Sequence, residues 1–75
     1  MRELFVMESC PYCQKVLKSF DENSVDYTVR DISDRENYEA LISLGGKEQV
    51  PFLYDEENDV KMYESDDIIN YVLSK

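Results

Sequence analysis

Two cysteines, Cys10 and Cys13, are the only cysteines in this 75-residue chain, and Pro11 and Tyr12 separate them. Two thiols at this spacing can cycle between dithiol and disulfide, because one sulfur can attack a substrate and the other is close enough to release it. A zinc site is less favoured, since zinc usually takes four ligands and the chain has no further cysteine and no histidine. A structural disulfide and a pair of unreactive core thiols are two further interpretations. The pattern predicts redox chemistry and no metal site.

The predicted surroundings make the two thiols unequal. An apolar run over residues 4–7 predicts a strand, and a helix is predicted to begin at Pro11, where proline is tolerated. Cys10 is then the residue that caps the helix. It faces free backbone N–H groups and the positive end of the helix dipole, which favour its thiolate form. Cys13 falls on the apolar side of the helix. We therefore expect Cys10 to attack and Cys13 to resolve.

Composition limits the remaining function classes. The length predicts one small domain spanning residues 1–75. The formal net charge of -9 comes from 17 acidic and 8 basic residues. A surface of this sign repels phosphate backbones and anionic lipid, so we expect no nucleic-acid or membrane partner. The chain shows no spanning apolar run and no signal-peptide pattern, so we expect a cytoplasmic monomer.

Hydrophobic periodicity predicts alternating strands and helices. Strands are predicted at residues 4–7, 25–30, 50–54 and 60–63. Helices are predicted from Pro11 to a polar stop at 21–24, after a capping box at 33–36 to Gly45 and Gly46, and from Ser65 onward. The helical residues expected in the core are Cys13, Val16, Leu17, Phe20, Tyr38, Leu41, Ile42, Ile68, Ile69, Val72 and Leu73. The order β-α-β-α-β-β-α predicts an α/β fold, with a mixed four-stranded sheet covered by three helices.

Three separated segments resemble the dithiol glutaredoxins of the thioredoxin-fold superfamily. Residues 10–13, Cys-Pro-Tyr-Cys, match the motif of that family as they stand. Val50 and Pro51 match a Val-Pro pair whose proline is cis in the family and faces the thiols, although Pro51 could also simply begin a strand. Residues 64–68 look like the family's glutathione-contacting helix start. The order of elements agrees over essentially the whole chain, so the resemblance implies a thioredoxin fold.

The resemblance also implies an activity. Such proteins are glutathione-dependent oxidoreductases that reduce protein disulfides and glutathione mixed disulfides, and glutathione recycles them as a co-substrate without a bound cofactor. The implied partners are glutathione and disulfide-containing or glutathionylated proteins. The implied glutathione-binding residues are Tyr12, Gln49, Val50, Ser65 and Asp66. Ser65 and Asp66 could equally be a helix cap, and the two roles are compatible.

One departure from the family concerns charge. Glutaredoxins commonly carry lysine or arginine three residues before the first cysteine, and this chain has Met7 there, followed by Glu8. The missing cation predicts weaker glutathione binding and less thiolate at the nucleophile. Lys15, Lys47 or Arg35 could compensate if the fold brings one of them near.

Two rival functions are compatible with the sequence. The missing cation favours a small redoxin that is fed by a thioredoxin reductase and donates electrons to a reductase such as ribonucleotide reductase. The second rival is a non-catalytic thioredoxin-fold binding module, or an iron–sulfur carrier of the same fold. Cluster-carrying glutaredoxins generally have a single cysteine in a glycine-containing motif, so Pro11 and Cys13 argue against the carrier.

Overall fold

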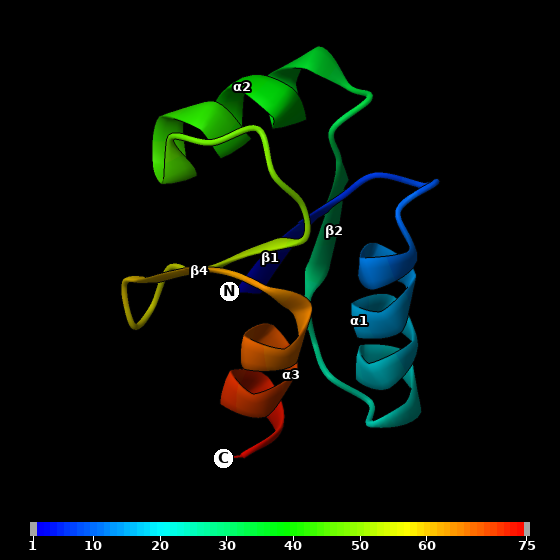
Figure 1. Cartoon of the computed structure of the whole chain (residues 1–75). Helices are drawn as coiled ribbons and strands as arrows, with labels where there is room; N and C mark the ends of the chain where they lie inside the picture. The colour runs from blue at the N-terminus through cyan, green and yellow to red at the C-terminus, as the bar shows by residue number, and fades with distance from the viewer. Residues whose placement is uncertain (1, 75) are drawn as a thin grey trace.

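The computed structural model describes residues 2–74, and its elements follow the predicted order (Figure 1). The elements are β1 (Arg2–Val6), α1 (Pro11–Glu22), β2 (Thr28–Asp31), α2 (Arg35–Gly45), β3 (Phe52–Asp55), β4 (Val60–Tyr63) and α3 (Ser65–Leu73). They form one sheet in the order β2-β1-β3-β4, in which β1 pairs parallel with β2, and β3 pairs antiparallel with β1 and β4. This arrangement confirms the predicted α/β thioredoxin fold.

The central strand β1 supplies side chains to both faces of the sheet, because successive residues of a strand point in opposite directions. Leu4 and Val6 face α1 and α3, which pack beside each other, and Phe5 faces α2 on the other side (Figure 1). The buried core on the first face is Leu4, Val6, Cys13, Val16, Phe20, Leu53, Ile68 and Val72. The smaller core under α2 is Phe5, Leu41 and Phe52. The prediction that the first strand is buried on both faces is correct.

The first two strands begin and end at other residues than predicted. β1 ends at Val6, so Met7 lies in the loop toward α1 and is 42% exposed. β2 begins at Thr28, and Val25 and Tyr27 instead pack against the core from the preceding connection. Val29 is 48% exposed, because β2 is an edge strand that pairs only with β1.

The third strand also shifts along the chain. It begins at Phe52, so Val50 and Pro51 form the loop before it. It ends at Asp55 rather than at Tyr54, so Asp55 belongs to the strand and not to the turn. Asp55 is buried, and its carboxylate accepts hydrogen bonds from the Tyr71 hydroxyl at 2.8 Å and from the Asn58 amide at 3.0 Å. These two hydrogen bonds provide polar partners for the buried Asp55 carboxylate at the end of β3.

The cap of α2 differs from the predicted one. Asp34 is the capping residue, and its carboxylate accepts the Glu36 N–H at 3.0 Å. Ser33, the predicted cap, donates its own N–H to the Asp31 carboxylate at 2.9 Å. Gly46 ends the helix with a φ of 80°, a left-handed conformation that favours glycine.

The cap of α3 is different as well. Glu64 precedes the helix with a φ of 77°, so Ser65 is the first helical residue and is buried there. Leu73 lies near the end of the helix and is exposed, which corrects its predicted place in the core. Leu17 and Ile69 are half-buried against the larger core, and Tyr38 and Ile42 on α2 are half-buried as well.

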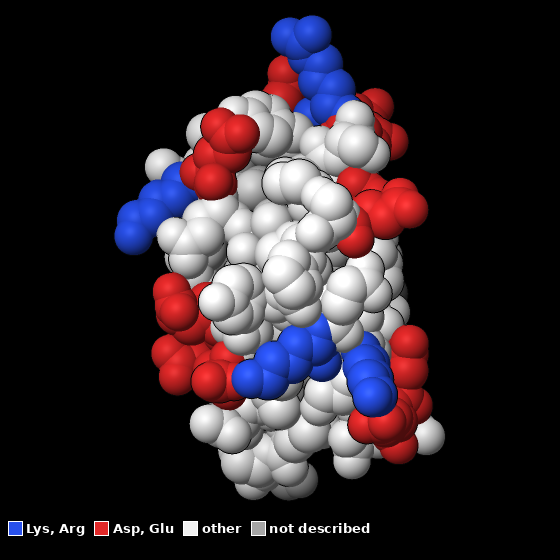
Figure 2. Space-filling view, turned by 45° about the vertical axis from the view of Figure 1, so that its right-hand side comes forward, with Lys and Arg blue, Asp and Glu red and all other residues white. Residues whose placement is uncertain are grey.

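Charged side chains cover much of the surface. Figure 2 shows one face on which acidic side chains flank an uncharged centre, with a few basic side chains among them. No helix within residues 2–74 is long and apolar enough to cross a membrane.

Candidate active site

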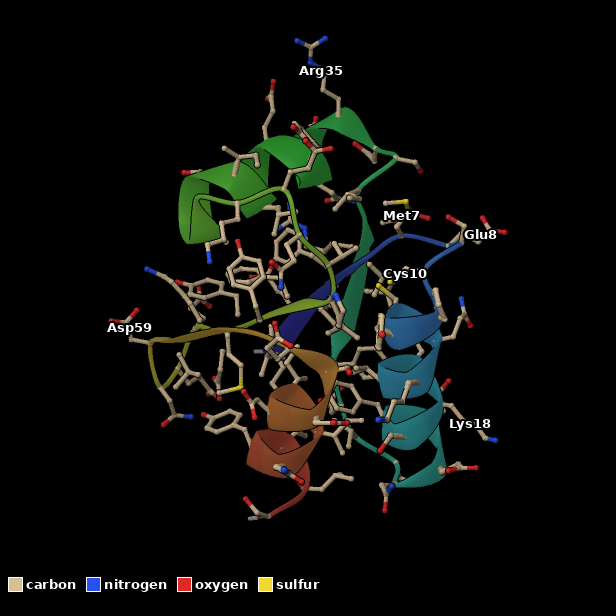
Figure 3. The ribbon with its side chains drawn as sticks, viewed as in Figure 1. Met7, Glu8, Cys10, Lys18, Arg35 and Asp59 are labelled. Atoms are coloured by element: carbon tan, nitrogen blue, oxygen red, sulfur yellow. The ribbon has the colours of Figure 1, made fainter. Side chains whose placement is uncertain are left out.

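Cys10 caps α1 at the end of the loop that follows β1. Its backbone is extended, with φ of -87° and ψ of 115°, and Pro11 occupies the first helical position as predicted. The Cys10 N–H donates to the Met7 carbonyl at 3.0 Å, and the Cys10 carbonyl accepts the Gln14 N–H at 3.1 Å. These bonds fix the Cys10 thiol at the N-terminus of the helix, where it is partly exposed below Met7 and Glu8 (Figure 3). The positive end of the helix dipole lies at this place.

Cys13 lies in the first turn of α1 and is fully buried in the core. Burial raises the pKa of the Cys13 thiol to about 12, although a hydrogen bond with the Met7 backbone opposes that rise. The neighbouring Cys10 sulfur and the charge of Asp31 raise the pKa further. Both thiols are free. No group of histidine, cysteine, aspartate and glutamate side chains within residues 2–74 could hold a metal ion with them.

The loop before β3 lies against the Cys10 thiol. The Val50–Pro51 peptide bond is cis, as the resemblance implied. The Val50 carbonyl oxygen lies 4.0 Å from the Cys10 sulfur, and Pro51 is buried behind it. The loop therefore places backbone polar groups of residue 50 beside the reactive sulfur.

A hollow of about 560 Å³ opens beside this loop, between the start of α1 and the start of α3. Its lining residues are Tyr12, Gln49, Val50, Pro51, Glu64, Ser65, Asp66 and Asp67. The fold thus brings together all the residues predicted to bind glutathione. Glu64 and Asp67 are not among the predicted residues, although they directly flank Ser65 and Asp66 in the sequence.

Of the three cations that could compensate for the missing one, Lys15 contacts a residue that lines the hollow. The Lys15 ammonium on α1 lies 2.5 Å from a carboxylate oxygen of Asp66 on α3. Lys47 lies over an aromatic ring of β4, 5.7 Å from its centroid. Arg35 pairs with Glu39 at the far side of α2 (Figure 3). Lys15 is therefore the cation placed to interact with a ligand.

A second hollow of about 440 Å³ lies beside the loop that carries the motif. It is lined by Met7, Glu8, Ser9, Asp31 and Ser33, none of which the sequence predicts as a site residue. Asp31 ends β2 beside the end of β1, since the two strands are parallel. Hydrogen bonding by Ser33 lowers the pKa of Asp31, so its carboxylate is charged at neutral pH.

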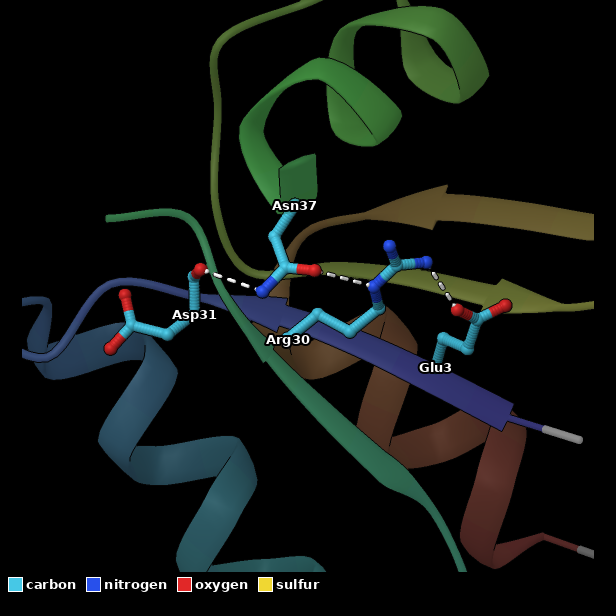
Figure 4. Close-up of polar contacts among 4 residues, drawn as sticks. All are labelled: Glu3, Arg30, Asp31 and Asn37. Carbon is cyan, nitrogen blue, oxygen red and sulfur yellow. Dashed lines mark hydrogen bonds and ion pairs between the residues drawn. The ribbon is translucent and has the colours of Figure 1, made fainter. Parts of the chain in front are cut away.

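A chain of polar contacts fixes Asp31 beside the motif (Figure 4). The Asn37 amide donates to the Asp31 carbonyl at 2.9 Å and accepts the Arg30 Nε–H at 2.8 Å. Arg30 in turn lies 2.6 Å from the Glu3 carboxylate and stacks over the Phe5 ring. The contacts join β1, β2 and α2. They also hold the Arg30 guanidinium against Glu3 and Asn37, and Arg30 does not line the second hollow.

Comparisons with known proteins agree with this fold. A family model, glutathione S-transferase, N-terminal domain, matches residues 4–75. No curated protein matches the chain. Among solved structures, the thioredoxin-like protein BC3987 superposes with a TM-score of 0.82 at 17% identity, over 97% of this chain and 100% of that one.

Two further solved structures superpose on this chain, one from a longer protein and one from a protein of similar length. Human glutathione S-transferase T1-1, as a W234R mutant, superposes with a TM-score of 0.83 at 22% identity, over 99% of this chain and 31% of the transferase. The glutaredoxin-like NrdH-redoxin from Escherichia coli, described as having a thioredoxin-like activity profile, gives a TM-score of 0.77 at 19% identity, over 95% and 92% of the two chains. At such identities, the likeness shows the fold alone.

Proposed function

This chain belongs to the glutathione S-transferase N-terminal domain family, and we propose that it is a glutathione-dependent dithiol–disulfide oxidoreductase of the glutaredoxin type. The observation that carries the proposal is the unequal pair of thiols. Cys10 is partly exposed at the start of α1, whereas Cys13 is buried one turn later. The proposed setting is the cytoplasm, where thiols stay reduced.

The proposed reaction begins at the Cys10 thiolate. It attacks the glutathionyl sulfur of a mixed disulfide, so a Cys10–glutathione disulfide forms and the substrate leaves as a thiolate that takes a proton from water. The thiolate of a second glutathione then attacks the glutathionyl sulfur on Cys10. This step restores the Cys10 thiolate and releases glutathione disulfide. The net reaction consumes one glutathione thiol and converts the mixed disulfide into the substrate thiol and glutathione disulfide.

A protein disulfide would use Cys13 as well. Cys10 attacks one substrate sulfur and displaces the other as a thiolate, and the Cys13 thiolate then attacks Cys10 and releases the substrate sulfur that was bonded to it. Burial keeps Cys13 protonated before that step, and the adjacent Cys10 sulfur adds to the effect. Once Cys10 is part of a disulfide it carries no charge, so its contribution to the raised pKa of Cys13 is lost. We expect Cys10 to attack first because it is partly exposed, whereas Cys13 is fully buried.

Glutathione would bind along the first hollow. The Val50 backbone beside Cys10 suits the cysteinyl part of the tripeptide, and Tyr12 would flank its sulfur. The backbone N–H groups at the start of α3, around Ser65 and Asp66, suit a carboxylate of its γ-glutamyl end. The Asp66 carboxylate suits the ammonium group of that end, which would have to compete with Lys15.

A coupled glutathione–disulfide reduction assay with single-cysteine variants tests the proposal. Cys10→Ser should fall to the uncatalysed rate, because it lacks the nucleophile. Cys13→Ser should keep its reduction of glutathione mixed disulfides, which needs only one thiol, and lose its reduction of protein disulfides. Activity retained by Cys10→Ser would contradict the assignment.

A second candidate function rests on the charge of the site. Within residues 2–74, neither hollow includes a lysine or arginine among its lining residues, and Met7 and Glu8 precede the motif. This lining is poor for the carboxylates of glutathione and favours a redoxin that is reduced by a thioredoxin reductase. Turnover with NADPH and thioredoxin reductase but not with glutathione would select this candidate. Turnover with glutathione alone would exclude it.

A further inference from the structure

Carboxylates line both hollows that border the reactive loop. Glu64, Asp66 and Asp67 line the hollow next to the Val50–Pro51 loop. Glu8 and Asp31 line the hollow that includes residues 7–9. A substrate that presents a disulfide to Cys10 would therefore meet negative charge in both hollows beside the motif.

Among residues 2–74, most of these carboxylates have no cationic partner at the site. Lys15 pairs with Asp66, but Glu64 accepts its hydrogen bond from the uncharged Gln49 amide at 3.3 Å. Asp31 accepts from a backbone N–H and its pKa is lowered, so it remains an anion. Glu8 is exposed in the loop just before Cys10 (Figure 3).

Apart from Lys15, the nearby basic residues face elsewhere. Arg30, next to Asp31 in the sequence, is engaged by Glu3 and Asn37. Lys18 lies further along α1 and points away from Cys10 (Figure 3). Among residues 2–74, the charged side chains that line the two hollows are therefore all acidic.

We propose that the disulfide substrates of this site are basic peptides or proteins, with lysine or arginine close to the disulfide. The inference rests on the proposed dithiol chemistry and specifies its substrate class. Surface charges interact over roughly 8 Å at physiological salt and over about 30 Å at 0.01 M. The carboxylates in the two hollows would steer a cationic substrate to the thiol and slow an anionic one.

The chemical step is the reduction of the peptide disulfide by the two thiols of the protein. Cys10 bonds to one peptide sulfur and displaces the other, and Cys13 then bonds to Cys10 and displaces the first peptide sulfur. The peptide gains two electrons and two protons, and the protein is left as the Cys10–Cys13 disulfide. One turnover of reduced protein therefore needs no added reductant.

The test mixes pre-reduced protein with one of two disulfide peptides, which are identical except for lysines or glutamates beside their cysteines. The lysine peptide should react faster by about tenfold or more at 0.01 M ionic strength. The ratio of the two rates should approach one near 1 M salt, where the screening length is about 3 Å.

Matched variants locate the effect. The double variant Glu8→Gln/Asp67→Asn removes two charges at the hollows and should lower the rate ratio several-fold. The control Glu56→Gln/Asp59→Asn removes two charges in the turn between β3 and β4, whose Asp59 lies on the opposite side of the molecule from Cys10 (Figure 3). The control should keep the wild-type ratio.

The remaining outcomes have distinct meanings. Equal rates for the two peptides, or a faster glutamate peptide, would overturn the charge preference and leave the dithiol chemistry standing. Equal losses of preference in the two double variants would overturn it too, since net charge would then be the cause. Failure to reduce either peptide would overturn the proposed function and this inference together.

Discussion

Cys10 and Cys13 are separated by one helical turn but have different surroundings. Cys10 lies at the mouth of the site, 4.0 Å from the Val50 carbonyl oxygen. Cys13 lies in the core with Leu4 and Val16, where no water can stabilise a thiolate. Burial therefore favours the neutral form of Cys13, whereas Cys10 stays partly open to solvent.

This difference predicts selective alkylation at pH 8. With a pKa of about 12, roughly one Cys13 in ten thousand is a thiolate at that pH. Iodoacetamide should therefore label one thiol per folded chain, at Cys10, as peptide mass spectrometry can show. A raised pKa favours the protonated folded form, so Cys13 labelling should increase, and the folded state lose stability, as the pH rises from 9.0 toward 12.

The single-cysteine variants serve as controls for the labelling. Cys13→Ser should be labelled at the wild-type rate, and Cys10→Ser should be labelled only after unfolding in urea. Rapid labelling of folded Cys10→Ser at pH 8 would contradict the buried, neutral state of Cys13.

Helix α2 approaches the sheet closely at Gly45. A Cβ atom at this position would overlap the Tyr63 hydroxyl oxygen and lie 3.0 Å from a ring carbon of Phe52. The Tyr63 hydroxyl is held in place, since it accepts the Lys47 N–H at 3.2 Å and donates to the Lys47 carbonyl at 3.1 Å. Glycine is needed here for space.

Gly45→Ala should consequently destabilise the fold by about 1–3 kcal/mol, the usual cost of overpacking. Alanine gains about 1 kcal/mol in helix propensity over glycine, which reduces the loss without reversing it. Urea unfolding measures the difference. Ser43→Ala, at an exposed position of the same helix, should change stability by less than about 0.5 kcal/mol. Equal stability of the two variants would show that α2 does not approach the sheet this closely.

The order of the elements could be predicted from sequence because it depends on hydrophobic periodicity. The boundaries could not, because they depend on competition between local hydrogen bonds. Ser33 and Asp34 are both good caps. The Asp34 carboxylate takes the role by accepting the Glu36 N–H, and Ser33 lies in the preceding turn, where its N–H donates to Asp31. Similarly, Glu64 occupies the position just before α3, so Ser65 is the first residue inside the helix.

The two hollows differ in how far the sequence could predict them. The first is lined by segments that resemble a known family, so its residues could be predicted, apart from Glu64 and Asp67. The second joins the loop before Cys10 to Asp31 and Ser33, more than one element away along the chain. Only the parallel pairing of β1 and β2 brings these segments together.

At the scale of the whole molecule, the net charge of -9 can be interpreted in a second way once the positions of the acidic residues in the fold are known. From composition alone, it argues against polyanionic partners. In the structure, carboxylates line both hollows beside the motif, while Lys18, Arg30 and Arg35 are directed elsewhere. Under the proposed charge preference, glutathione, an anion, would react at a disadvantage compared with a basic disulfide.

Trapping the glutathione adduct tests the nucleophile and its partner together. Reduced Cys13→Ser protein is mixed with glutathione disulfide and its intact mass is measured. One glutathione should be added per chain, and peptide mapping should place it on Cys10. Reduced Cys10→Ser protein should gain none while it stays folded. An adduct on Cys13 of folded Cys10→Ser, or no adduct on Cys13→Ser, would contradict the account.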